Sequence, residues 1–147
     1  MIRMNQFLFD QDYILWVQEN VAKLKAKDFE NLDLDNLIEE FESLIYILKR
    51  DLDDDLKNLL INMLKRLYVP LPNQFERWQS DISFYRCGIE LIFEDAPSLK
   101  ENWDERFLFN YSSALYALSA DYPDTNFPEA WQLERDIESI LNKRFWQ

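Results

Sequence analysis

The sequence contains no histidine, one glycine and one cysteine, and these shortages exclude several classes of site. Without histidine the chain cannot form a His-based catalytic triad, a His metal ligand or an imidazole pH switch. One glycine is too few for a P-loop or a dinucleotide-binding fingerprint. The single Cys87 excludes an internal disulfide and the usual zinc sites, and it suits a reducing compartment. We therefore expect no bound metal and no cofactor.

Proline is also sparse, at five residues, whereas aromatic and aliphatic residues are plentiful. Sheet-rich folds need many glycine-bearing turns, so this composition favours helices joined by few connections. Hydrophobic residues make up 48% of the chain, which is enough for a packed core. The 147 residues fit one domain, and no linker or internal repeat is visible, so we expect a single domain over residues 1–147.

Charge of one sign dominates the chain, with a formal net charge of −12. Such a field repels the phosphate backbone, so direct nucleic-acid binding is not expected, whereas a basic protein partner would be attracted. No apolar run reaches the ~18 residues of a membrane span, and the first residues lack the apolar region of a signal peptide. We expect a soluble, cytoplasmic protein that does not enter a membrane.

Two helix starts stand out near the beginning of the chain. Asp10 is suited to cap a first helix, with Phe9 placed to pack on Ile14. Asp33 is suited to cap a second helix, whose apolar residues recur at helical spacing without a glycine or proline until Pro70. The apolar stripe of this second helix consists of Leu37, Phe41, Leu44, Leu48, Leu52, Leu56, Leu59, Met63 and Leu67.

The length of the second helix raises a question about its continuity. A straight helix over residues 34–69 would be ~54 Å long, at ~1.5 Å per residue. A compact domain of this size is only ~40 Å across. We therefore favour a break or kink between Tyr46 and Asp54, although the uninterrupted stripe argues for a continuous helix. A continuous helix would project from the bundle or take part in a dimer.

The rest of the chain predicts further helices around a leucine-, isoleucine- and aromatic-rich core. A helix after Pro70 carries Gly88, which we expect to mark a close contact between helices. Another helix follows Pro97, and a short one comes near the C-terminus. The aromatic tail that ends in Phe145 and Trp146 is expected to dock on its own bundle. The predicted fold is all-α, an up-and-down helical bundle of four to five helices.

Three blocks of this sequence resemble the bacterial, largely cyanobacterial, domain-of-unknown-function family twenty-nine. The likeness covers about residues 8 to 100. The matching residues are Asp10, Asp12, Tyr13, Trp16, Phe29, Leu32, Asp33, Asn36, Leu37, Ile38, Glu39 and Glu40 in the first block, Lys65, Tyr68 and Pro70 in the second, and Trp78, Ile82, Arg86, Asp95, Pro97, Ser98 and Leu99 in the third. The resemblance implies an all-helical bundle and no settled activity. The chain departs from the family pattern at Asn62, where relatives carry histidine, at Arg66, where they carry tryptophan, and at residues 45–47, where they carry Gly-Arg-Ser.

The carboxylates of the second helix invite a metal-site hypothesis. Glu39 and Glu42 have the spacing of a di-iron bundle motif, but no histidine can complete the ligand set. Their positions between the apolar residues of the stripe place at least some of them on the solvated face. We therefore expect no metal site and no catalytic residues here.

Basic residues suggest a second hypothesis, a cationic pocket near Pro70. Lys65, Tyr68, Trp78 and Arg86 could converge there and bind an anionic group of a ligand or partner. We favour the other interpretation of these basic residues, a set of intrahelical ion pairs such as Asp53–Lys57.

The nearly empty catalytic inventory favours a non-catalytic protein-interaction module, whose partner is a protein, a basic one or a second copy that forms a homodimer. Whether the chain is an enzyme stays open, with a non-enzymatic role favoured. One alternative is an antidote-like or DNA-mimicking regulator of a nucleic-acid process. Another is a small anionic-ligand-binding or enzymatic bundle that uses Lys65, Tyr68 and Arg86.

Overall fold

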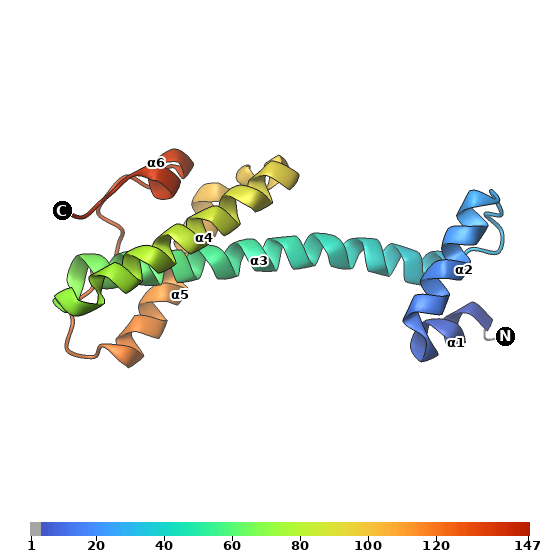
Figure 1. Ribbon diagram of the computed structural model, residues 1–147, viewed down its shortest axis with the longest axis horizontal. Coiled ribbons are helices and arrows are strands. Elements are labelled where there is room, and N and C mark those ends of the chain that lie inside the picture. Colours follow the sequence, from blue (N-terminus) through green and yellow to red (C-terminus); the bar gives the residue numbers. More distant parts are fainter. Residues whose placement is uncertain (1–3) are drawn as a thin grey trace. The chain divides into compact units, whose positions relative to one another are not determined.

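A computed structural model of the protein describes residues 4–147, and every regular element in this range is helical. The α-helices are α1 (Met4–Gln11), α2 (Tyr13–Lys25), α3 (Leu34–Tyr68), α4 (Phe75–Asp95), α5 (Trp103–Asp121) and α6 (Ile137–Asn142). Two short 3₁₀ turns, η1 (Pro72–Gln74) and η2 (Pro97–Lys100), each begin with a proline. The all-α prediction is confirmed (Figure 1).

The packing divides the chain into two compact units, and the division falls inside α3. The N-terminal unit ends at Ile47 and contains α1, α2 and the beginning of α3. The C-terminal unit starts at Leu48 and contains the rest of α3 together with α4, α5 and α6. The single-domain prediction for residues 1–147 is not tested by this division and stays a prediction.

The first predicted helix start is wrong by two residues. Asp10 lies inside α1, and Asp12 is the residue that caps α2, because its side chain accepts a hydrogen bond of 3.0 Å from the backbone N–H of Leu15. Both aspartates satisfy the capping preference, so that preference alone cannot choose between them. At the other end of α2, Lys27 has a φ of 57° and Asp28 N–H bonds to Lys23 O, as in a Schellman motif.

The expected break between Tyr46 and Asp54 is also wrong. Helical conformation runs without interruption from Leu34 to Tyr68. No glycine or proline interrupts this stretch, so nothing in the backbone favours a kink. The size argument assumed that all residues pack round one core, whereas α3 contributes to two units.

The C-terminal unit has the well-packed core that the apolar stripe predicted. Leu52, Leu56, Leu59 and Met63 of α3 are completely buried, and side chains of α4, α5 and α6 pack against them. Gly88 of α4 marks the predicted close contact, because a Cβ atom there would lie 2.5 Å from Oδ2 of Asp55 on α3.

Polar contacts fix the other elements of this unit. Asp53 accepts hydrogen bonds from Arg106 Nη1 at 2.6 Å and Asn110 Nδ2 at 2.8 Å, which joins α3 to α5. These partners come from another helix, in contrast to the intrahelical Asp53–Lys57 pair that the sequence suggested. Long-range pairing prevails because Arg106 is largely buried and needs an anionic partner.

The aromatic tail docks on its own unit, as predicted. Phe145 and Trp146 are half-buried and pack against the core. Arg66 donates a hydrogen bond of 2.9 Å to the backbone oxygen of Gln147, and Arg86 donates to the oxygens of Ile140 at 2.9 Å and Lys143 at 2.5 Å. Two arginines therefore hold the last ten residues against the unit. None of the helices in residues 4–147 is long and apolar enough to cross a membrane.

Asp55 gives the fold a testable pH dependence. Burial beneath Gly88, together with the charges of Asp51 and Asp54, raises the pKa of the Asp55 carboxyl above its usual value of 3.8. Because the pKa is higher in the folded state, proton binding by Asp55 stabilises the fold, and this stabilisation is complete at a pH below the pKa of the unfolded state. It is lost as the pH rises through the pKa of the folded state. Asp55→Asn should therefore raise the thermal midpoint at pH 7.

The gain from Asp55→Asn should shrink as the pH falls and vanish below about pH 3.8, the unfolded-state value, where Asp55 is protonated in both states. Thermal unfolding followed by circular dichroism between pH 3 and 8 measures the difference. Asp54→Asn, which removes the same charge from an exposed neighbour, is the matched control and should give a smaller gain. A stabilisation by Asp55→Asn that stays constant across this range would contradict the assignment.

Candidate functional site

A buried carboxylate organises the N-terminal unit. Asp33 is only 5% exposed and directly precedes α3. Its Oδ2 accepts hydrogen bonds of 2.8 Å from Trp16 Nε1 on α2 and of 2.8 Å from Asn36 Nδ2 in the first turn of α3. Its backbone N–H donates to Asn20 Oδ1 at 3.1 Å, and Asn20 in turn donates to the carbonyl oxygen of Trp16 at 2.9 Å. We call these four residues, Trp16, Asn20, Asp33 and Asn36, the Asp33 network.

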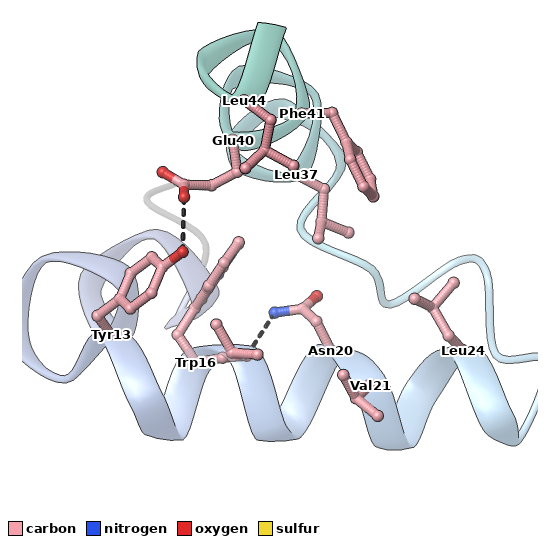
Figure 2. A pocket seen from close by; sticks show the side chains of 10 residues that line it. Tyr13, Trp16, Asn20, Val21, Leu24, Leu37, Glu40, Phe41 and Leu44 are labelled. Atoms are coloured by element: carbon pink, nitrogen blue, oxygen red, sulfur yellow. Dashed lines mark hydrogen bonds between the residues drawn. The ribbon is translucent and has the colours of Figure 1, made fainter. Parts of the chain in front are cut away.

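The Asp33 network joins α2 to the start of α3 and leaves a groove between them. The groove has a cavity volume of about 250 Å³. Figure 2 shows Val21 and Leu24 of α2 on one side and Leu37, Phe41 and Leu44 of α3 on the other. Trp16 and Asn20 line the groove as well as belonging to the network, so the same contacts that hold the helices together also shape the groove.

One polar contact spans the groove. The hydroxyl of Tyr13 donates a hydrogen bond of 2.6 Å to Oε2 of Glu40 (Figure 2). This hydrogen bond to a carboxylate raises the pKa of the Tyr13 hydroxyl, with smaller contributions from burial and from the charge of Glu40. Among the described residues that line the groove, Glu40 is the only carboxylate.

The surface beside the groove is unusually apolar. Ile38, Phe41 and Ile45 of α3 are 53%, 64% and 56% exposed, and Val21 and Leu24 on α2 are also exposed. Soluble proteins seldom leave many large apolar side chains together in solvent, and such patches mark interaction sites. The apolar stripe of α3 is therefore a core face from Leu52 onward and a surface in the N-terminal unit.

The four residues predicted to form a cationic pocket are only partly brought together. Lys65 and Trp78 line one pocket of about 380 Å³, with Lys65 Nζ 5.4 Å from the centroid of the Trp78 ring. Burial lowers the pKa of Lys65, and the charge of Asp81 opposes this effect.

Tyr68 and Arg86 do not line that pocket. Tyr68 packs edge-on against Phe127, with ring centroids 6.3 Å apart, and Arg86 is bound to the backbone near the C-terminus. Their polar and aromatic groups therefore serve contacts within the C-terminal unit.

Sequence reasoning missed the Asp33 network, although it identified Leu37, Phe41 and Leu44 of the groove as one apolar face. Asp33 was interpreted only as a helix cap, and Trp16 and Asn36 entered only as matches to a family pattern. The sequence did contain a signal for this network. Asp33 precedes a predicted helix, and the indole of Trp16 and the amides of Asn20 and Asn36 are possible partners for it. Buried carboxylates need such donors, so the pattern could have suggested a network.

The Asp33 network predicts a local loss of stability on mutation. Asp33→Ala removes the acceptor of two buried donors, and each unsatisfied donor costs about 1–3 kcal/mol. Amide hydrogens of α2 and of the first turns of α3 should exchange at least about 30-fold faster, because the two lost acceptors together make opening of the N-terminal unit easier. Hydrogen exchange measured by mass spectrometry tests this.

Asp35→Ala is the matched control for Asp33→Ala, because it removes an exposed carboxylate two residues away in the first turn of α3. This control should change exchange by less than about fivefold, the size of a helix-dipole effect. Exchange in α5 should be unaltered in both variants. Equal effects of the two variants on α2 would show that burial of Asp33 is unimportant.

Comparison of the sequence with protein-family models identifies a family for this chain. The model of the family "Domain of unknown function DUF29" matches residues 8–146. The match extends well beyond the residues 8 to 100 over which the three sequence blocks are recognisable, and it includes both units. Searches of curated proteins and of solved structures found no match. Because the family model covers nearly the whole chain, the protein belongs to the DUF29 family of domains of unknown function.

Proposed function

We propose that the protein is a non-catalytic protein-interaction module that binds its partner in the groove of the N-terminal unit. The observation that carries this proposal is the exposed apolar surface formed by α2 and the beginning of α3, which includes Phe41 at 64% exposure. Removal of such a surface from water is the main driving force for protein association, at ~25 cal/mol per Å².

The lining of the groove supports a binding role over a catalytic one. General acid–base chemistry needs positioned groups with suitable pKa values. The groove offers one carboxylate, Glu40, and its hydrogen-bond partner Tyr13, whose raised pKa keeps the hydroxyl protonated at neutral pH. Its other described lining residues are apolar or belong to the Asp33 network.

The C-terminal unit is assigned a supporting role in this proposal. We propose that α3, α4 and α5 form an up-and-down bundle there, because their buried faces share one core. This unit acts as the scaffold, and the N-terminal unit makes the contact. An exposed free thiol at Cys87 suits a cytoplasmic setting.

Site-specific photo-crosslinking in living cells tests the interaction. A photoreactive amino acid in place of Phe41 should give a discrete adduct with a protein, because this side chain lies in the groove. The same amino acid in place of Phe84, which is 70% exposed on α4, is the matched control and should give no discrete adduct. Failure of the Phe41 position to form an adduct, or equal adducts from both positions, would refute the proposal.

A second candidate function is supported by the pocket around Lys65 in the C-terminal unit. Lys65 and Arg77 bring two cations to this pocket, against one carboxylate from Asp81. Trp78 provides an aromatic wall. We propose binding of a small anionic molecule there, with the ammonium group as the main contact.

Titration with inorganic phosphate, followed by NMR of the backbone amides around Trp78, tests this second function. Lys65→Gln should weaken binding about tenfold, as expected for loss of one charge-assisted hydrogen bond of about 1.5 kcal/mol. Lys57→Gln, on the same helix and outside the lining, should bind as the unaltered protein does. Absence of saturable shifts in the unaltered protein would exclude this candidate.

A further inference from the structure

The exposed residues of α3 in the N-terminal unit follow a coiled-coil pattern. Leu34, Ile38, Phe41 and Ile45 are separated by four, three and four residues, and all are more than half exposed. At 3.6 residues per turn, their side chains fall within about 60° of one another round the helix. We call these four residues the α3 seam. Leu37 and Leu44 lie beside it and line the groove (Figure 2).

The residue types of the α3 seam match those of helices in two-stranded coiled coils. With Ile38 and Ile45 at the first apolar position of each heptad, Leu34 and Phe41 occupy the second. In parallel coiled coils, isoleucine at the first position combined with leucine at the second favours two strands, so the α3 seam would pair with one second α3. A seam of this composition is complementary to a copy of itself, which is the property that a two-fold symmetric interface requires.

We propose that the groove and the α3 seam are covered by a second copy of this chain, so that two α2–α3 hairpins form a four-helix interface. This inference rests on the proposed function and specifies its partner. A pair of helices with an apolar groove between them completes a core most simply by adding a second pair, as in four-helix bundles. The two-fold arrangement closes on itself and therefore stops at a dimer.

The available apolar area is sufficient for a stable dimer. Val21, Leu24, Leu34, Ile38, Phe41, Leu44 and Ile45 are each about 40–65% exposed. At roughly 100 Å² of exposed surface per large side chain, they present about 700 Å² per copy, close to the ~800 Å² per partner of a standard protein interface. The interface requires no rearrangement within the hairpin, because the Asp33 network already fixes α2 against α3.

Charge distribution distinguishes a second copy from a basic partner. Glu40, the carboxylate of the groove, already accepts a hydrogen bond from Tyr13, and the α3 seam itself contains no charged residue. Two other acids of this segment, Asp35 and Glu42, directly follow Leu34 and Phe41 in the sequence and flank the α3 seam. Two copies would therefore bring apolar faces together and like charges to the rim. Salt should tighten such a dimer, whereas it would weaken the binding of a basic protein.

Sedimentation equilibrium of the full chain tests the inference. The unaltered protein at micromolar concentration should have a molecular mass of twice 17.9 kDa. Ile38→Glu combined with Ile45→Glu should weaken association at least about 100-fold, because two central apolar contacts are replaced by buried like charges. Both positions are exposed in the single chain, so the variant should keep the circular dichroism spectrum of the unaltered protein. Raising salt from 50 to 500 mM should lower the dimer dissociation constant.

The matched control is Phe84→Glu combined with Phe109→Glu, which introduces the same charges at residues 70% and 66% exposed in the C-terminal unit. This variant should dimerise as the unaltered protein does. A monomeric unaltered protein, or a dimer that the α3 seam variant leaves intact, would overturn the inference. In the first case, a photo-adduct between Phe41 and a different protein would still support the proposed function, and no adduct would refute that function as well.

Discussion

The structure of the N-terminal unit depends on the need to satisfy one buried carboxylate. An unpaired charge in a protein interior is strongly unfavourable, and no cation contacts Asp33 among the interactions described. Its compensation comes from dipoles, namely the indole N–H of Trp16, the amide of Asn36 and the amino end of α3. These donors lie on two helices, so Asp33 remains satisfied only while α2 stays against α3. The groove persists for the same reason, because Trp16 belongs both to the network and to the groove lining.

The two parts of α3 use the same periodicity for different purposes. From Leu52 onward the apolar residues are buried by α4, α5 and α6, and Asp53 and Arg106 add a specific link to α5. Before Ile47 most of the apolar residues of α3 remain exposed, although their spacing is just as regular. Exposure there opposes solubility, and the many carboxylates nearby offset it, since ten of them lie in residues 8–47. An apolar surface flanked by carboxylates in this way can still associate with a partner.

How much of this arrangement could be predicted depends on which interactions act locally. The scarcity of glycine and the regular apolar spacing predict helices, and the all-α structure follows. Gly88 and the docked tail were also predictable, because a lone helical glycine and a terminal aromatic pair each need a packing partner. The choice between Asp10 and Asp12 as the cap of α2 could not be predicted, because it depends on where α1 ends. The local composition of α3 favours a continuous helix, as the structure shows. The break was predicted wrongly because it was inferred from the assumed diameter of one compact domain.

The candidate site shows a more general limit of periodicity. Spacing identifies Leu37, Phe41 and Leu44 as one face of a helix, but it contains no information about what covers that face. Coverage depends on tertiary contacts, and here α2 covers only part of the face while leaving Phe41 in solvent. Conversely, Lys65 and Arg86 have similar chemistry, yet one lines a pocket and the other is fixed to backbone carbonyls. A regular apolar stripe that remains exposed next to a rigid network is therefore better evidence of an interaction surface than the stripe itself. The stripe is needed by any packed helix, whereas its exposure has a free-energy cost that only association removes.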